Sequence, residues 1–175
     1  SIDITMGFSP LDGVMMGTRC GAIDPAIIIF LLKNEKLSLN DIDIALNKKS
    51  GMLGISKLSS DMQEIHKAIG SGSSQAKLAH QMFCLSIAKA IAAMSSNFTR
   101  LDAIAFTGGI GFHDHVTRSA ILPQGNLLGL EIDGRVNQKL PANGLISNKN
   151  STCAIFAIEA NEELIIAQES LSFDL

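Results

Sequence analysis

Arg19 lies in a setting that indicates chemistry. It stands in the run GVMMGTRCGAIDP, which is almost free of other charges, with glycines at positions 17 and 21. A planar guanidinium in such a loop is suited to clamp a carboxylate or a phosphate. The alternative is a structural ion pair with Asp12 or Asp24, and the sequence leaves both interpretations open.

A glycine-rich segment, Thr107-Gly108-Gly109-Ile110-Gly111, follows a short apolar run. Adjacent glycines let backbone N–H groups approach a phosphate or a ribose at the start of a helix. The segment matches neither the G-x-x-x-x-G-K-[ST] loop nor the G-x-G-x-x-G fingerprint. A tight strand-to-helix turn is therefore the alternative to a ligand site.

Carboxylates and histidines are the possible metal ligands. Glu162 and Glu163 open the last expected helix, where acids usually compensate the helix dipole but could also bind Mg²⁺ together with nucleotide phosphates. His113 and His115 would diverge at a helix start, and no third ligand lies near them in the sequence. The residue types alone do not separate these interpretations.

The elements that must position these residues alternate between helices and strands, which predicts one layered α/β domain over residues 1–175. A strand-like start at 1–6 is expected to lead into an ordered loop over 6–21, and further loops are expected over 51–60 and 107–111. The predicted helices cover 26–32, 38–47, 62–69, 74–95, 113–122 and 162–171. The predicted strands cover 101–106, 126–132, 144–147 and 151–158.

The segment over 74–95 is expected to be the longest helix and the centre of the core. Its apolar stripe at helical spacing consists of Leu78, Met82, Leu85, Ala88 and Ile91. His66 and His80 lie in amphipathic helices and are predicted to face the surface or a partner.

Composition excludes several classes of partner. The 175 residues are 46% hydrophobic and 18% charged, which suits one compact core. A net charge of −3 offers no footprint for nucleic acid, and no apolar run approaches the ~20 residues that cross a bilayer. We therefore expect a cytoplasmic protein with neither nucleic acid nor membrane as partner, in which Cys20, Cys84 and Cys153 are reduced core thiols.

Four segments resemble the acetate kinase family in their order and separation: SIDITMGFSPLDGVMMGTRCGAIDPAI, SGMLGISKLSSDMQEI, LDAIAFTGGIG and NEELIIA. The resemblance implies the C-terminal, nucleotide-binding half of a kinase. It implies the ribonuclease-H-like α/β fold of the acetate and sugar kinase, Hsp70 and actin superfamily. The implied reaction transfers the γ-phosphoryl group of ATP to acetate or propionate, giving ADP and an acyl phosphate, reversibly and with Mg²⁺.

The resemblance also implies partners. Family members are homodimers that associate largely through this half. Their catalytic aspartate, acetate pocket and one phosphate loop would lie upstream of Ser1, in an N-terminal half. This chain alone is therefore expected to be inactive.

The resemblance assigns site residues position by position. Arg19 matches the family's transition-state arginine, and Glu162 matches the Mg²⁺ ligand of its Asn-Glu-Glu-Leu segment. Two further segments match those that hold adenosine in the family: Asp61, Met62 and Gln63, and Gly109, Ile110, Gly111, Phe112 and His113.

This chain departs from the family at two of those positions. It has Phe112-His113 where the family usually has Glu-Asn, and Gln63 replaces a basic residue that could stack on the purine. Both departures bear on nucleotide preference or affinity. They motivate an alternative function, a non-catalytic nucleotide-binding or dimerisation module of the same fold.

Overall fold

The computed structural model describes residues 1–122, 128–139 and 144–172. The chain divides into two compact units, residues 1–100 and residues 101–175. Each unit is described by itself below. That both belong to a single nucleotide-binding domain over 1–175 stays a prediction.

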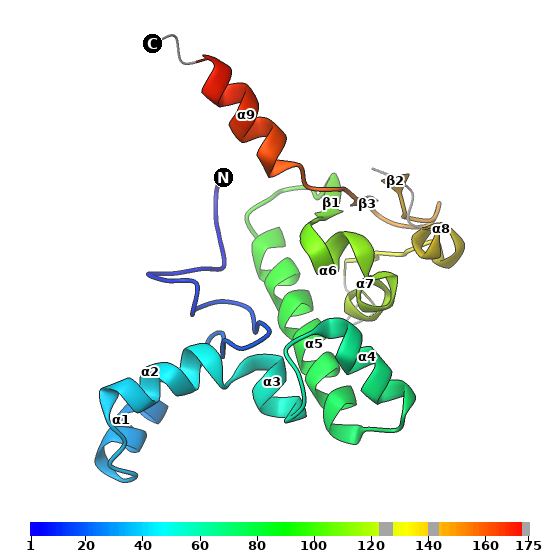
Figure 1. Cartoon of the computed structure of the whole chain (residues 1–175). Coiled ribbons are helices and arrows are strands. Elements are labelled where there is room, and N and C mark those ends of the chain that lie inside the picture. The colour runs from blue at the N-terminus through cyan, green and yellow to red at the C-terminus, as the bar shows by residue number, and fades with distance from the viewer. Residues whose placement is uncertain (123–127, 140–143, 173–175) are drawn as a thin grey trace. The chain divides into compact units, whose positions relative to one another are not determined.

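The first unit is built from helices. They are α1 (Pro25–Lys33), α2 (Leu39–Lys48), α3 (Gly51–Ser56), α4 (Met62–Gly70) and α5 (Ser74–Ser95). The 22-residue helix α5 runs along α3 and α4, and α1 lies beside α2 (Figure 1).

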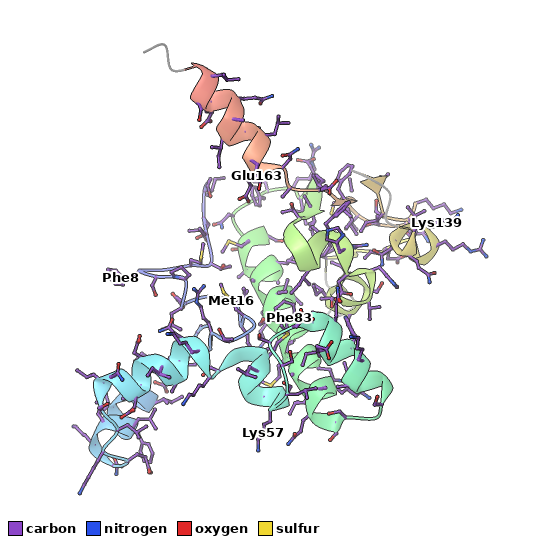
Figure 2. All side chains as sticks on the ribbon, viewed as in Figure 1. Phe8, Met16, Lys57, Phe83, Lys139 and Glu163 are labelled. Atoms are coloured by element: carbon purple, nitrogen blue, oxygen red, sulfur yellow. The ribbon has the colours of Figure 1, made fainter. Side chains whose placement is uncertain are left out.

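Residues 1–24 contain no helix or strand in the described structure, which confirms the loop expected over 6–21. The strand-like start expected over 1–6 is wrong. A strand requires a hydrogen-bonded neighbour, and in the described structure no strand pairs with residues 1–6. The side chains of Ile2 and Ile4 are accordingly 75% and 60% exposed. Phe8 is fully exposed as well and points into solvent (Figure 2).

Side-chain caps start the helices at the predicted places. The Asp24 carboxylate accepts the N–H of Ala26 ahead of Pro25 at the first helical position. Ser38 and Asp41 form a reciprocal capping box at the start of α2. These local contacts explain why the sequence predicts both helix starts.

Helix α3 corrects the loop expected over 51–60. Gly51 begins it in a left-handed backbone conformation with φ +61°, and the preceding Ser50 provides no side-chain cap. The first N–H groups of α3 are instead satisfied by carbonyls of residues 16 and 17, far away in the sequence. A local pattern cannot predict such a helix.

The buried face of α5 is not the predicted apolar stripe. Leu78, Met82 and Leu85 are 41–49% exposed. The buried residues are Ala76, Ala79, His80, Phe83 and Cys84. Small residues at 76 and 79 let neighbouring helices approach closely, and the larger Phe83 fills the same face one turn further along. The surface position predicted for His80 is therefore wrong: His80 is only 8% exposed, and its Nε2 lies 3.5 Å from the Cys84 sulfur.

By length and composition alone, α5 could also cross a membrane. The core helix of a soluble protein passes the same test, and α5 packs against α3 and α4. The prediction of no membrane partner stays a prediction.

The second unit contains a small mixed sheet. Its elements are β1 (Ala103–Phe106), α6 (Gly108–His113), α7 (His115–Ile121), α8 (Gly134–Gln138), β2 (Gly144–Leu145), β3 (Ala154–Ala157) and α9 (Glu162–Ser172). The strand order is β1-β3-β2, with β3 parallel to β1 and antiparallel to β2. Strands β1 and β3 and helix α9 confirm the predicted elements.

Three expectations for the second unit need correction. The glycine segment predicted as a loop over 107–111 is mostly helix α6, and Asp114 separates it from α7. Helix α8 was not predicted. Of the strand expected over 126–132, the described part contributes one bridge between Ile132 and Ser147, and residues 126–127 lie outside the described residues.

The three cysteines are free thiols. Cys84 and Cys153 are buried as predicted, whereas Cys20 is half-buried. Burial raises the pKa of the Cys20 and Cys153 thiols above the ordinary value, so both are neutral at pH 7.

The corrected face of α5 predicts the cost of two adjacent substitutions. Phe83→Ala should lower the free energy of unfolding by about 3–5 kcal/mol because it opens a cavity. Met82→Ala on the exposed face should cost less than about 1 kcal/mol. Urea unfolding of both variants measures the difference, and equal losses would contradict the assignment of the buried face.

Candidate functional site

The segment Met16–Arg19, here called the arginine loop, is held by hydrogen bonds on both sides. The N–H groups of Ser50, Met52 and Leu53 donate to the carbonyls of residues 18, 16 and 17 at 2.9, 3.0 and 2.9 Å. On the other side, the Thr18 hydroxyl donates to the Asn47 carbonyl at 2.9 Å. The loop is thus fixed between the end of α2 and the start of α3; Figure 2 marks Met16 beside α3.

The Arg19 side chain is half-buried. It forms no ion pair with Asp12 or Asp24, and the structure describes all three residues. Its Nη1 lies 3.8 Å from the Met16 sulfur. The Asp12 carboxylate accepts the N–H of Gly13, and Asp24 caps α1. The ion-pair interpretation of Arg19 is therefore wrong, and binding of an anion by its guanidinium stays a prediction.

The segment Asp61-Met62-Gln63 divides into three different roles. One Asp61 carboxylate oxygen accepts the N–H groups of Gln63 and Glu64 at 2.7 and 3.2 Å, which makes it the N-cap of α4. Met62 is buried. Gln63 alone presents an exposed side chain that is free to face a ligand.

The arginine loop also approaches the residue before this segment. A Cβ placed on Gly17 would lie 3.1 Å from the Ser60 carbonyl oxygen and 3.2 Å from the Ser60 Cβ. The backbone of the arginine loop at Gly17 therefore lies close to Ser60, the residue that precedes Asp61, within the first unit.

The glycines of α6 differ in why the structure needs a glycine at each position. Gly108 has φ +71°, a conformation that favours glycine. A Cβ on Gly111 would lie 3.3 Å from the backbone of Phe106, so this glycine lets α6 pack on β1. A Cβ on Gly109 would meet nothing within 4 Å. Gly109 therefore leaves open space in which a ligand could approach the backbone.

Phe112 and His113 also have separate environments. Phe112 is buried, and its ring stands edge-on to the His113 ring at a centroid distance of 4.9 Å. His113 is exposed at the end of α6. Of the two departures from Glu-Asn, only His113 therefore presents its side chain to a ligand.

A buried arginine that the sequence reasoning missed holds the end of α6. Arg118 is fully buried and donates to the carbonyls of Gly111, at 2.9 Å, and Phe112. Its Nε and Nη2 donate to the side-chain and backbone oxygens of Asn137 at 2.7 and 2.9 Å. Burial lowers the Arg118 pKa, but a guanidinium stays charged at neutral pH. Carbonyls at the end of a helix stabilise this charge.

Asn137 completes the Arg118 network. Its side-chain NH₂ donates to the His115 carbonyl at 2.9 Å and to the Ser119 hydroxyl at 2.8 Å. The sequence contains one sign of this network: Arg118 lies three residues before Ile121, on the face of α7 that is buried. A charged residue on the same helical face as Ile121 would have pointed to Arg118, but nothing local points to Asn137.

Glu162 begins α9, the helix that follows the parallel strand β3 along the chain. The Asn161 side chain accepts the N–H of Leu164 at the start of this helix. Glu159, Glu162 and Glu163 line an open hollow of about 580 Å³ (Glu163 is labelled in Figure 2). Carboxylate oxygens suit Mg²⁺ when phosphates and waters complete the ligands. The described residues contain no group of three or more side chains placed to hold a metal ion by themselves.

The sheet brings Glu162 and the glycine segment to one edge. Strands β1 and β3 are parallel neighbours with Phe106 paired to Ala157, and the Ile158 N–H donates to the Phe106 carbonyl. The glycines follow β1 and the glutamates follow β3, so both lie beyond the carboxyl ends of parallel strands, where ligands bind in open α/β sheets. Arg19 and residues 61–63 belong to the other unit, and their approach to this edge stays a prediction.

Comparison with known proteins agrees with the resemblance seen in the sequence. Residues 1–168 match the Acetokinase family. Over 170 residues the chain is 42% identical to the acetate kinase of Pseudothermotoga lettingae, covering 97% of this chain and 42% of that protein. It is 43% identical to the acetate kinase of Carboxydothermus hydrogenoformans over 171 residues, covering 98% and 43%. The chain therefore spans about two fifths of the length of these curated relatives.

Solved structures are similar over the same region. A propionate kinase of Francisella tularensis subsp. tularensis has a TM-score of 0.88 at 42% identity, covering 94% of this chain and 42% of that chain. The Porphyromonas gingivalis acetate kinase has a TM-score of 0.89 at 34% identity, covering 96% and 42%. The predicted α/β fold of the acetate and sugar kinase superfamily is confirmed.

The Arg118 network predicts an unequal effect of two arginine substitutions in the second unit. Arg118→Met leaves buried carbonyls without a donor and should lower the free energy of unfolding by about 3 kcal/mol. Arg135→Met, on the exposed surface of α8, should change it by less than about 0.5 kcal/mol. Denaturant unfolding compares the two variants, and a neutral Arg118→Met would contradict the network.

Proposed function

Because the chain belongs to the acetokinase family, we propose that it forms the C-terminal part of a kinase that phosphorylates a short carboxylate. The γ-phosphoryl group of ATP passes to acetate or propionate, and ADP and an acyl phosphate are formed reversibly. Both acceptors come from the names of the relatives, one an acetate kinase and one a propionate kinase.

The observation that carries this proposal is the Arg19 guanidinium, fixed by its backbone and left without an ion pair to Asp12 or Asp24. Phosphoryl transfer spreads negative charge over the oxygens of the transferring group. A positioned arginine binds those oxygens with its planar fork and stabilises the transition state. Arg19 is the catalytic residue of the proposal.

The nucleotide is assigned to two segments. Gln63 offers an exposed side chain next to the Asp61 cap, and the segment Gly109–His113 offers backbone N–H groups beside open space at Gly109. Asp61 and Met62 act through the fold of their segment rather than through free side chains, because one caps α4 and the other is buried.

Glu162 is the proposed Mg²⁺ ligand, with Glu159 and Glu163 beside it in the same hollow. When bound with the nucleotide, Mg²⁺ would neutralise phosphate charge. The exposed position of these carboxylates supports a site that phosphate oxygens complete.

The remaining parts of the proposal concern partners. An N-terminal half supplies the acceptor pocket, two copies associate as a homodimer, and the complete enzyme is cytoplasmic. The exposed apolar residues of α1, Ile27, Ile29, Phe30 and Leu32, support an association surface.

Arg19→Ala tests the transfer reaction in a polypeptide in which this chain follows the N-terminal part of a family member. Acyl phosphate made from MgATP and acetate or propionate, trapped as the hydroxamate, should fall by a factor on the order of 10³–10⁵. Arg19→Lys keeps the charge but loses the fork, so it should recover only part of the rate. An unchanged rate in Arg19→Ala would exclude Arg19 from the reaction.

Gly109→Ala tests the nucleotide contact and separates the kinase from a module that no longer binds nucleotide. The added methyl meets no protein atom within 4 Å, so folding should be retained while affinity for MgADP falls about tenfold through contact with the ligand. Gly134→Ala is the matched control, since its Cβ also meets nothing within 4 Å and it begins a helix. Titration calorimetry measures the MgADP affinity of both variants. Equal affinities would show that the nucleotide does not contact this segment.

A further inference from the structure

We propose that Gly51 and Thr18 are positioning residues for Arg19, and that the junction between α2 and α3 determines where the guanidinium lies. This inference rests on the proposed function of Arg19. Neither residue is placed in contact with a substrate. Each acts through the backbone of the arginine loop.

The start of α3 holds one side of the loop. N–H groups in the first turn of a helix have no partner within the helix. At α3 the N–H groups of Met52 and Leu53 donate to the carbonyls of Met16 and Gly17, and the Ser50 N–H donates to the Thr18 carbonyl. The arginine loop therefore serves as the cap of α3, and its carbonyl positions are fixed by a helix.

The close approach depends on the absence of a side chain at Gly51. A Cβ at this position would lie 2.2 Å from the Met16 carbonyl oxygen and 2.8 Å from the Arg19 carbonyl oxygen. Cβ atoms essentially never lie within 3.0 Å of a non-bonded atom, so a side chain at Gly51 requires one of the two segments to shift. Gly51 also has φ +61°, where residues with a Cβ are strained.

A methyl group at Gly51 would displace the loop rather than the helix. Met52, the next residue of α3, is only 1% exposed, and α3 packs against α5. Residues on the loop side, Gly17 and Arg19, are only half-buried. The less tightly packed side should yield, and it carries the guanidinium.

The end of α2 holds the other side of the loop. The Thr18 hydroxyl donates to the Asn47 carbonyl at 2.9 Å, and the Cys20 N–H donates to the Leu46 carbonyl at 3.0 Å. Residues on both sides of Arg19 are thus bound to the last turn of α2. The backbone therefore sets the position of Arg19, since its side chain has only the Met16 sulfur as a polar contact among the described residues.

Displacing a catalytic group by about 1 Å can lower a rate on the order of a hundredfold. Loss of this positioning should lower kcat, because the guanidinium acts on the transferring group. It should leave the nucleotide KM nearly unchanged. A general loss of folding would instead lower the amount of active enzyme and the melting temperature.

The first test is Gly51→Ala in the polypeptide with an N-terminal half described above. We expect kcat to fall by about 30-fold to 100-fold, with the KM for ATP changed less than about threefold. Gly72→Ala is the matched control: Gly72 has φ +89° but no atom within 4 Å of an added Cβ. It shares the backbone strain without the collision and should keep kcat within about twofold. Equal kcat values for the two variants would overturn the inference.

Combination with Arg19→Ala shows whether Gly51 acts through the arginine. The double variant Gly51→Ala/Arg19→Ala should be no slower than Arg19→Ala alone, because residues that act through one group are not additive. Losses that multiply would mean that Gly51 acts independently of Arg19 and would also overturn the inference.

Thr18 provides the second variant in case Gly51→Ala does not fold. Thr18→Val removes the hydroxyl that binds Asn47 and should lower kcat by about threefold to tenfold, whereas Thr18→Ser keeps the hydroxyl and should retain the rate. Equal rates for Thr18→Val and Thr18→Ser would overturn the inference.

The rate of the unsubstituted polypeptide separates failure of the proposed function from failure of the inference. If that polypeptide forms no acyl phosphate, the proposed function fails and the inference fails with it. The outcomes for the variants concern the inference alone.

Discussion

The hydrogen bonds between the arginine loop and the start of α3 are the contact on which the first unit's candidate site depends. Carbonyls of residues 16, 17 and 18 accept the N–H groups of Met52, Leu53 and Ser50. This contact caps a short helix that lacks a side-chain cap, and it fixes Arg19 without an ion pair to Asp12 or Asp24. An arginine placed in this way keeps its hydrogen-bonding capacity for a ligand.

The second unit positions its candidate site by similar means. Arg118 binds the carbonyls at the end of α6 and both oxygens of Asn137, which ties the glycine segment to α8. The side chains that secure each site segment, Thr18 in one unit and Arg118 in the other, bind backbone carbonyls. Gln63 in the first unit and His113 and Glu162 in the second are exposed, and the proposed function assigns contact with the ligand to them.

Local sequence signals predict the parts of the fold that depend on local contacts. Asp24-Pro25 and Ser38 identify the starts of α1 and α2 because their side chains cap nearby N–H groups. Helix α3 is missed because its cap comes from residues more than thirty positions earlier. The buried face of α5 is missed because it carries Ala76, Ala79, His80 and Cys84 beside Phe83, and not the leucines and methionine of the apolar stripe.

The same distinction holds for the site. The isolation of Arg19 in the sequence singles it out but leaves an ion pair with Asp12 or Asp24 open, and only the structure shows that neither aspartate pairs with it. The roles of Gly51, Arg118 and Asn137 arise from contacts between distant segments. The most direct measurement is therefore the affinity of the complete enzyme for MgADP with aluminium fluoride and acetate, a mimic of the transferring phosphoryl group. Arg19→Ala should weaken this complex by about 10³-fold while leaving the affinity for MgADP unchanged. Equal affinity for the mimic in both proteins would contradict a transition-state role for Arg19.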